Sequence, residues 1–369
     1  MSVPVAEWGR RLTDTVRAAL AAGDVERARQ LVLEGDGQAR SLDREYTLMY
    51  RGLGITIRVM LPLLREAASR AGAPERDLAV AELAGLLRGF RRDMMGLMTR
   101  AYGAQASAPA GTERAGHSDL ELETALTAEM LVASETAFDR EQQRTAQAIL
   151  GALEAGDVAA AQALLEVKER LQYLPLHDRL VRFMAASMGW VLARFGTAEL
   201  LRFHVKTAEG QRGGFEKWDR MTAEEFAWTT AFLIKQHMGT LVVSEDSEKF
   251  TFEQTPCGSG GRLTLLGAYE GPLALPYVEE PGPLTFGERR LRVYCSHCPV
   301  WNGVAPILWF GRPHWVFENA SRPDGSCTLH LYKRRDGAPR EYVDRLGAGH
   351  GVRAVAGQTA GPRRPAKEG

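Results

Sequence analysis

The stretch AALAAGDVERARQLV (18–32) returns later in the chain as GALEAGDVAAAQALL (151–165). In both copies apolar residues recur at three- and four-residue spacing, which is the spacing of amphipathic helices. Glycine suits the end of one helix and aspartate suits the N-cap of the next. Each copy therefore predicts two helices joined by a short turn, at Gly23 in the first copy and at Gly156 in the second.

The similarity extends outward from these turns. Residues 43–61 match residues 176–195, and residues 91–98 match residues 235–242, if an insertion of roughly ten residues is placed near RGGFEKWDRM. We interpret this as two related helical units. The alternative is a chance similarity between helices rich in alanine, leucine and glutamate.

The predicted domain organisation follows from these matches and from composition. The two helical units are expected at residues 1–102 and 120–240, and the small, Pro- and Gly-bearing segment 103–119 is expected to be a flexible linker. A mixed α+β domain is expected at residues 241–345. The tail at residues 346–369 has too little apolar surface to fold.

The charge balance excludes some classes of partner. The 369 residues contain 46 Lys plus Arg and 46 Asp plus Glu, so no net field favours nucleic acid or an anionic membrane. The N-terminus lacks the apolar region of a secretory signal, and no uninterrupted apolar run approaches the roughly 20 residues that span a bilayer. We expect a cytoplasmic protein, with a small molecule as partner and homo-oligomer formation left open.

The pattern changes near residue 240. TLVVSEDSEKFTFEQTP (240–256) predicts two strands around a polar turn. Further short β-branched and aromatic runs are RLTLLGAY (262–269), RRLRVYCS (289–296), HWVFENA (314–320) and CTLHLYKR (327–334), whereas VWNGVAPILWF (300–310) is the segment that best fits a helix. The fold class is therefore α+β: duplicated helical units followed by a C-terminal mixed α+β domain with a Cys-rich metal site.

All four cysteines lie in this last part, because the first 256 residues contain none. In a reducing compartment they are more naturally thiols, metal ligands or nucleophiles than disulfides. Cys295 and Cys298 form a Cys-x-x-Cys pair that can present two thiolates to one ion, and Cys257 supplies a third. Thiolates suit Zn²⁺, so we predict a zinc site at Cys257, Cys295 and Cys298, without excluding iron.

The fourth ligand decides whether such a site is closed or open. His297 lies inside the Cys-x-x-Cys pair and is expected to point away, so His314, Cys327 and His330 are the better candidates. A protein ligand would make the zinc structural, and a water would leave a position for chemistry. Two readings without a metal remain. In the first, Cys295 and Cys298 form a redox dithiol. In the second, Cys257 acts as a nucleophile beside His297 or His314.

The segment Ser259, Gly260, Gly261 and Arg262 follows the first cysteine. Glycines let backbone N–H groups converge on an anion, and arginine adds a bidentate donor, so we predict that these residues bind a substrate carboxylate. A plain glycine turn is the equally weighted alternative. His237 and His297 are the predicted acid/base residues, although isolated helical histidines are more often core residues.

A partial family resemblance covers the C-terminal third. It is carried by Cys298 with Gly303, Phe310-Gly311-x-Pro313, Val316-Phe317-Glu318, and Gly325-Ser326-Cys327 leading into TLHLY. In this order of features the segment resembles the 4-vinyl-reductase-type small-molecule-binding domain and is similar to the aminothiazoline-carboxylate hydrolase-like family. It departs from the former in having no cysteine after Glu318. The resemblance implies an α+β pocket for a small molecule and hydrolysis of a heterocycle or amide-like bond.

The sequence thus favours a zinc-dependent hydrolase or lyase that acts on a small carboxylate-bearing substrate, with a bound water as nucleophile. The alternatives are a small-molecule-binding or sensory module with a structural zinc, and a helical scaffold that the metal merely stabilises.

Overall fold

We analysed a computed structural model of the chain. The structure describes residues 3–72, 74–103, 119–318 and 322–347. Except for their ends, the predicted linker at 103–119 and the predicted tail at 346–369 lie outside the described residues.

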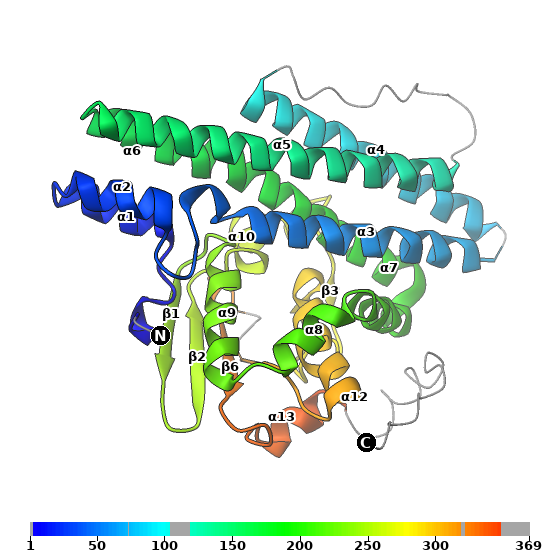
Figure 1. The fold of residues 1–369 in the computed structure, drawn as a ribbon. Coiled ribbons are helices and arrows are strands. Elements are labelled where there is room, and N and C mark those ends of the chain that lie inside the picture. The colour runs from blue at the N-terminus through cyan, green and yellow to red at the C-terminus, as the bar shows by residue number, and fades with distance from the viewer. Residues whose placement is uncertain (1–2, 73, 104–118, 319–321, 348–369) are drawn as a thin grey trace, which may run out of the picture.

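The first two thirds of the described chain are helical (Figure 1). The long helices are α1 (Leu12–Ala21), α2 (Val25–Glu34), α3 (Thr47–Arg70), α4 (Glu75–Tyr102), α5 (Leu120–Glu154), α6 (Val158–Glu166), α7 (Leu174–Glu209), α8 (Arg212–Asp219) and α9 (Ala223–Lys235). Single turns precede or join them at η1 (Val5–Glu7), η2 (Leu42–Arg44) and the π-helical η3 (Val167–Tyr173). Helix α7 is interrupted at Gly196, where φ is 80°.

The two Gly-Asp-Val turns are confirmed. Gly23 and Gly156 adopt φ values of 76° and 73°, a region that glycine enters without steric cost. Asp24 and Asp157 are the N-caps of α2 and α6, and each side chain accepts a hydrogen bond of 2.9 Å from the backbone N–H three residues on. The two helix pairs pack against each other around a small core: Leu12, Val16, Leu20, Ala28, Leu31, Val32, Ala39, Leu42, Ile149, Leu153, Ala161 and Leu165.

The third matched segment behaves differently in the two halves. Residues 91–98 lie within the C-terminal half of α4, whereas residues 235–242 cross the end of α9 and enter a strand. Between the end of α9 and this strand, the chain turns at Met238, whose φ is 57°. Beyond this turn the β-branched Val242 and Val243 favour an extended backbone, so the similarity in sequence does not carry a similarity in structure here.

The C-terminal part contains a four-stranded antiparallel sheet, and the predicted α+β class is confirmed at this level. The sheet order is β1-β2-β6-β5, from β1 (Leu241–Glu245), β2 (Lys249–Gln254), β6 (Cys327–Tyr332) and β5 (Val316–Glu318). A separate two-stranded ladder pairs β3 (Tyr277–Val278) with β4 (Leu291–Arg292). The remaining short elements are α10 (Gly260–Leu265), η4 (Val293–Ser296), α11 (His297–Pro299), η5 (Val300–Val304), α12 (Ala305–Phe310) and α13 (Arg340–Arg345).

These elements correct two of the predicted strands. The run 262–269, predicted as a strand, begins inside helix α10, and in the run 289–296 only two residues form a strand before η4 starts. Short apolar runs do not distinguish a strand from a helix by periodicity alone. The hairpin at 240–256 and the helix at 300–310 are both confirmed.

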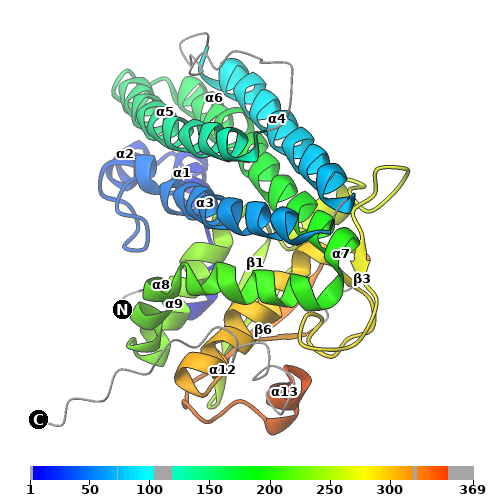
Figure 2. The ribbon, with the colours of Figure 1, turned by 90° about the vertical axis from the view of Figure 1, so that its right-hand side faces the viewer.

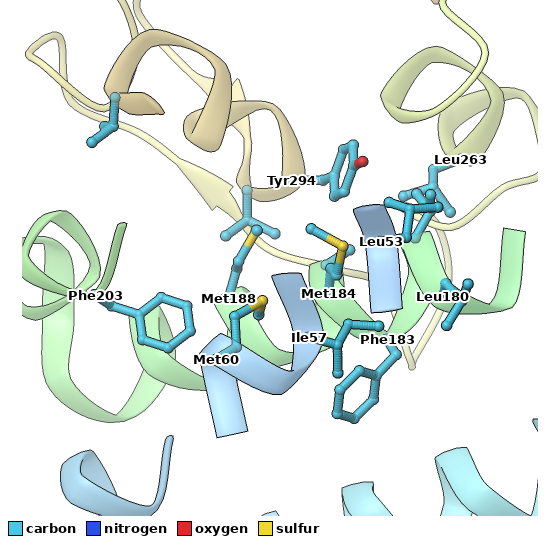
Figure 3. Packing of buried hydrophobic residues seen from close by; sticks show 14 of the residues in the cluster. Leu53, Ile57, Met60, Leu180, Phe183, Met184, Met188, Phe203, Leu263 and Tyr294 are labelled. Atoms are coloured by element: carbon cyan, nitrogen blue, oxygen red, sulfur yellow. The ribbon is translucent and has the colours of Figure 1, made fainter. Parts of the chain in front are cut away.

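One hydrophobic core joins the helices to the C-terminal part. Figure 3 shows side chains of α3 and α7 meeting residues from α10 and η4: Leu53, Ile57, Met60, Leu180, Phe183, Met184, Met188, Phe203, Leu263 and Tyr294. The sheet and its loops lie along one side of the helical layer (Figure 2). The expected boundary at residue 240 therefore marks a change of secondary structure within a shared core.

Among the described residues, one helical stretch, Leu42–Arg70, is long and apolar enough to cross a membrane. Half of its apolar window is buried inside the protein. A buried core helix gives the same signal, and α3 packs its apolar face against α5 and α7.

Candidate metal centre

All four cysteines of the chain line one small cavity of about 50 Å³. They come from three segments: Cys257 follows β2, Cys295 and Cys298 lie on η4 and α11, and Cys327 begins β6. All four are free thiols in the structure. The structure thus brings the three predicted metal-binding cysteines together and adds Cys327.

The sheet explains why Cys257 and Cys327 meet. Gln254 at the end of β2 pairs with Cys327 at the start of β6. Just beyond this pair, the backbone N–H of Cys257 donates a hydrogen bond of 2.9 Å to the carbonyl of Gly325. The antiparallel register therefore fixes these two cysteines on the same edge of the sheet.

The Cys-x-x-Cys pair lies on a helical segment rather than between strands. Ser296, between the two cysteines, donates a hydrogen bond of 2.6 Å to the carbonyl of Val293. Its oxygen also lies 2.9 Å from Nε2 of the buried His204 on α7. Because a hydroxyl that has given its proton to a carbonyl can only accept, His204 is the donor. This contact anchors the pair to the helical layer.

Close packing accounts for the glycines that follow Cys257. A Cβ atom placed on Gly260 would stand 2.7 Å from Sγ of Cys295, and one on Gly261 would collide with the carbonyl of Gly325. A Cβ on Gly258 would collide with the carbonyl of His237. These three positions therefore require glycine for steric reasons, independently of any anion.

The predicted substrate-binding residues divide into two groups. Ser259, Gly260 and Gly261 line the cysteine cavity, and Oγ of Ser259 lies 3.5 Å from Sγ of Cys257. Arg262 does not line the cavity. What Ser259 and the glycines hold stays a prediction.

Arg262 is instead bound by the protein itself. Its Nε donates to Asp178 at 3.0 Å, and its terminal nitrogens donate to the carbonyls of His237 at 2.6 Å and Met238 at 3.0 Å. Arg262 therefore ties α10 to α7 and to the end of α9, and its donors already have acceptors within the protein.

Desolvation favours the neutral thiol at Cys295, Cys298 and Cys327. Desolvation raises the pKa of Cys295 to about 12, although the guanidinium of Arg292 opposes this rise through its charge and a hydrogen bond. Burial also raises the pKa values of Cys298 and Cys327 well above the ordinary range, and the other cysteines raise them further. A bound cation would supply the positive charge that these thiolates lack, so metal binding here would release protons.

His297 lies beside the cysteines, with its ring nitrogens in defined roles. Nδ1 is 2.5 Å from the carbonyl of Tyr294, so it carries the proton, and Nε2 lies 3.5 Å from Sγ of Cys298. Burial lowers the pKa of His297 to about 4. The neutral ring thus presents a lone pair to the Cys298 thiol.

His237 belongs to a partly buried chain of polar residues that sequence reasoning did not assemble. Its Nδ1 lies 2.7 Å from Nε2 of His177, whose Nδ1 lies 2.8 Å from Asp178. Burial lowers the pKa of His237 well below its ordinary value, and His177, Arg262 and His297 lower it further. His237 does not line the cysteine cavity.

Of the three candidates for a fourth ligand, only Cys327 reaches the cavity. His314 bonds to Asp219 at 3.3 Å, and His330 bonds to Thr251 at 3.0 Å. His330 stands three positions after Cys327 on β6, so the alternation of side chains along a strand sends the two to opposite faces. The sequence analysis did not use this alternation, which shows that Cys327 and His330 cannot both face the cavity.

The ligands are not gathered as they would be around a single ion. Across residues 3–72, 74–103, 119–318 and 322–347, no group of three or more His, Cys, Asp or Glu side chains is arranged to hold one metal ion. The four cysteines therefore surround a cavity without converging on one point.

No family model matches this chain, and no curated protein or solved structure is similar to it at the level required for a match.

Proposed function

We propose that Cys257, Cys295, Cys298 and Cys327 ligate an iron–sulfur cluster and that the protein is a one-electron redox protein. The observation that carries this proposal is the meeting of all four cysteines around one cavity. Four cysteine thiolates are the ligand set of the common iron–sulfur clusters, which supply one-electron transfer when bound.

The size of the cavity favours a cluster over a single zinc ion. A tetrahedral Zn²⁺ with bonds of about 2.3 Å draws its four sulfurs into mutual contact. A cluster places iron and sulfide between the thiolates and holds them farther apart. The cavity of about 50 Å³ exceeds the roughly 10–15 Å³ that one water occupies, and the described thiols do not converge as single-ion ligands do.

Polar groups beside the sulfurs support a redox role. The hydroxyl of Ser259 lies beside Cys257, and the guanidinium of Arg292 hydrogen-bonds to Cys295. Hydrogen bonds to ligand sulfurs are a main means by which proteins set the reduction potential of a cluster. Glu288 also lines the cavity, so the charge of Arg292 does not act alone.

Four protein ligands also argue against the hydrolase or lyase hypothesis. That hypothesis needs an open coordination position, and a fourth cysteine in the same cavity would compete with water for that position. It also needs Arg262 for the substrate carboxylate, but Arg262 already donates to three protein acceptors. The second candidate function is a small-molecule-binding module with a structural zinc. The same four thiols would support it if they came together around one ion.

Metal analysis after anaerobic purification separates these functions. The cluster proposal expects iron and acid-labile sulfide in equal amounts, with a visible charge-transfer absorption that dithionite bleaches and an EPR signal in the reduced protein. Zinc without sulfide would reject the cluster. A cobalt-substituted form with a closed tetrathiolate spectrum would then assign a structural site.

Two variants on one strand test the role of the fourth cysteine. Cys327→Ser should lose the cluster, whereas His330→Gln, on the opposite face of β6, should keep it. If only Cys257, Cys295 and Cys298 bound the metal, Cys327→Ser would keep the full metal content. Far-UV circular dichroism of each variant shows whether a loss of metal follows from unfolding.

A further inference from the structure

A second cavity lies apart from the cysteine centre and shares no lining residue with it. It has a volume of about 10 Å³ and is formed by the segment before β5, the end of β6 and the turn that follows. Its lining includes three arginines, Arg312, Arg334 and Arg335, and no aspartate or glutamate among the described residues. Negative charge is therefore favoured in this cavity.

The tautomer of His314, which also lines the cavity, follows from its partner. His314 is 3% exposed, and its Nε2 lies 3.3 Å from Asp219 at the end of α8. Asp219 also accepts hydrogen bonds from Arg312 at 2.8 Å and from Arg335 at 2.5 Å, so it is ionised and cannot donate. The proton of His314 is therefore on Nε2, and Nδ1 is an acceptor. Burial, together with the charge of Arg312, lowers the pKa of His314 to about 4, so the ring is neutral at pH 7.

Three buried polar atoms of this region have no partner in the protein. They are Nε of Arg312, Nδ1 of His314 and Nε1 of Trp315, and none of them makes a hydrogen bond within the described part of the chain. All three residues line the cavity. Buried polar atoms are normally paired with protein, water or a bound group. Two N–H donors and one acceptor within four consecutive positions therefore point to a ligand.

The chemistry of these atoms selects the ligand. It must offer acceptors to Arg312 and Trp315 and a donor to His314, and it must be negative to suit the arginines. A singly protonated phosphate group meets all three conditions, because it combines anionic oxygens with one O–H. A carboxylate or a sulfate has no O–H at neutral pH. The volume of about 10 Å³ is roughly that of one water, so a single oxygen reaches the inner end and the rest of the group lies at the mouth.

The mouth of the cavity is formed by side chains that can move. Arg334 and Arg335 are 80% and 63% exposed, and they pair with Asp336 and Asp219. Outward rotation of these two guanidinium groups opens the way to the inner end, and both can then bind phosphate oxygens. Arg312 is only 16% exposed and stays in place as the inner donor.

We propose that Arg312, His314 and Trp315 bind the singly protonated phosphate group of a phosphate monoester, with Arg335 at the entrance. The site is independent of the cysteines and of any metal that they bind. The phosphate O–H donates to Nδ1 of His314, and the phosphate oxygens accept from Nε of Arg312 and Nε1 of Trp315. Small phosphorylated metabolites and phosphorylated protein side chains both carry this group.

Calorimetric titration of the full chain with two matched ligands tests the site. Methyl phosphate should bind about tenfold more tightly than methyl sulfate at pH 5, because methyl sulfate lacks the O–H and one charge-assisted hydrogen bond is worth about that factor. The affinity for methyl phosphate should fall about tenfold from pH 5 to pH 7, since the second pKa of a phosphate monoester is about 6. Methyl sulfate keeps its charge, so titration of a protein group such as His330 would change both affinities alike. No binding of methyl phosphate, or equal affinity for the two ligands, would overturn the proposal.

Matched variants test the individual donors. Trp315→Phe removes one N–H and keeps an aromatic ring, so it should weaken methyl phosphate binding about tenfold, whereas Trp309→Phe, outside the cavity, should not. Arg335→Gln should also weaken binding, and Arg340→Gln, at a side chain that is 93% exposed, should leave it unchanged. Equal affinities of Trp315→Phe and Trp309→Phe would contradict the assignment. A phosphoserine peptide that binds more tightly than methyl phosphate would identify a protein as the source of the phosphate, and equal binding would identify a small molecule.

Discussion

Glu45→Gln should change how stability depends on pH. Glu45 has no exposed surface, and its carboxylate accepts hydrogen bonds from the backbone N–H groups of Leu12 and Thr13 at the start of α1. Burial, followed by repulsion from Glu169, raises the pKa of Glu45 to about 7, although Lys168 and Lys235 oppose the rise.

The magnitude follows from linkage. The difference between about 7 and the ordinary 4.5 corresponds to about 3 kcal/mol, because one pKa unit is worth about 1.4 kcal/mol. The folded state holds this proton more tightly than the unfolded state, so Glu45 favours folding below pH 4.5. That contribution is lost as pH rises to about 7. Glutamine cannot ionise and should show no such loss.

Urea unfolding between pH 4.5 and 8 measures this directly. The free energy of unfolding of Glu45→Gln, minus that of the unchanged protein, should rise by up to about 3 kcal/mol across this range. Loss of one cap hydrogen bond adds an offset of about 1 kcal/mol that does not depend on pH. Glu121→Gln, at a side chain that is 83% exposed, is the control. A constant difference across the range would show that Glu45 ionises normally in the folded protein.

Two further substitutions test the packing around the site. Gly260→Ala should lower the metal content, because its Cβ would stand 2.7 Å from Sγ of Cys295; Gly151→Ala, at a helical glycine with open space, should leave it unchanged. Asp157→Ala should cost about 1 kcal/mol in the free energy of unfolding by removing the α6 cap, and Asp157→Asn should retain most of it.

The helical half was predictable because local chemistry decides it. Asp24 and Asp157 cap helices, and Gly23 and Gly156 end them, through contacts within a few residues. The strand hairpin at 240–256 was equally predictable, because apolar and polar residues alternate in it around a polar turn. By contrast, α10 begins where Gly260 and Gly261 meet Cys295 and Gly325, and these contacts arise only in the tertiary structure.

The polar chain shows the same limit. Asp178 and His177 are neighbours in sequence, but His237 reaches them from the end of another helix, 60 positions along the chain. The sequence singled out Arg262 correctly as an unusual residue and misjudged its partner. Its proximity to glycines suggested an anion, whereas the fold offers it Asp178 and two carbonyls.

Helix α7 is the element on which the whole candidate centre depends. His204 holds the Cys-x-x-Cys segment through Ser296, and Asp178 holds the Cys257 segment through Arg262. Between them, Met184 and Met188 pack beneath Tyr294, which lines the cavity (Figure 3). Neither of these two cysteine segments contains a long helix or strand of its own, so both are held by anchors on α7, one on each side of the break at Gly196. The helical layer therefore supports the segments that carry Cys257, Cys295 and Cys298.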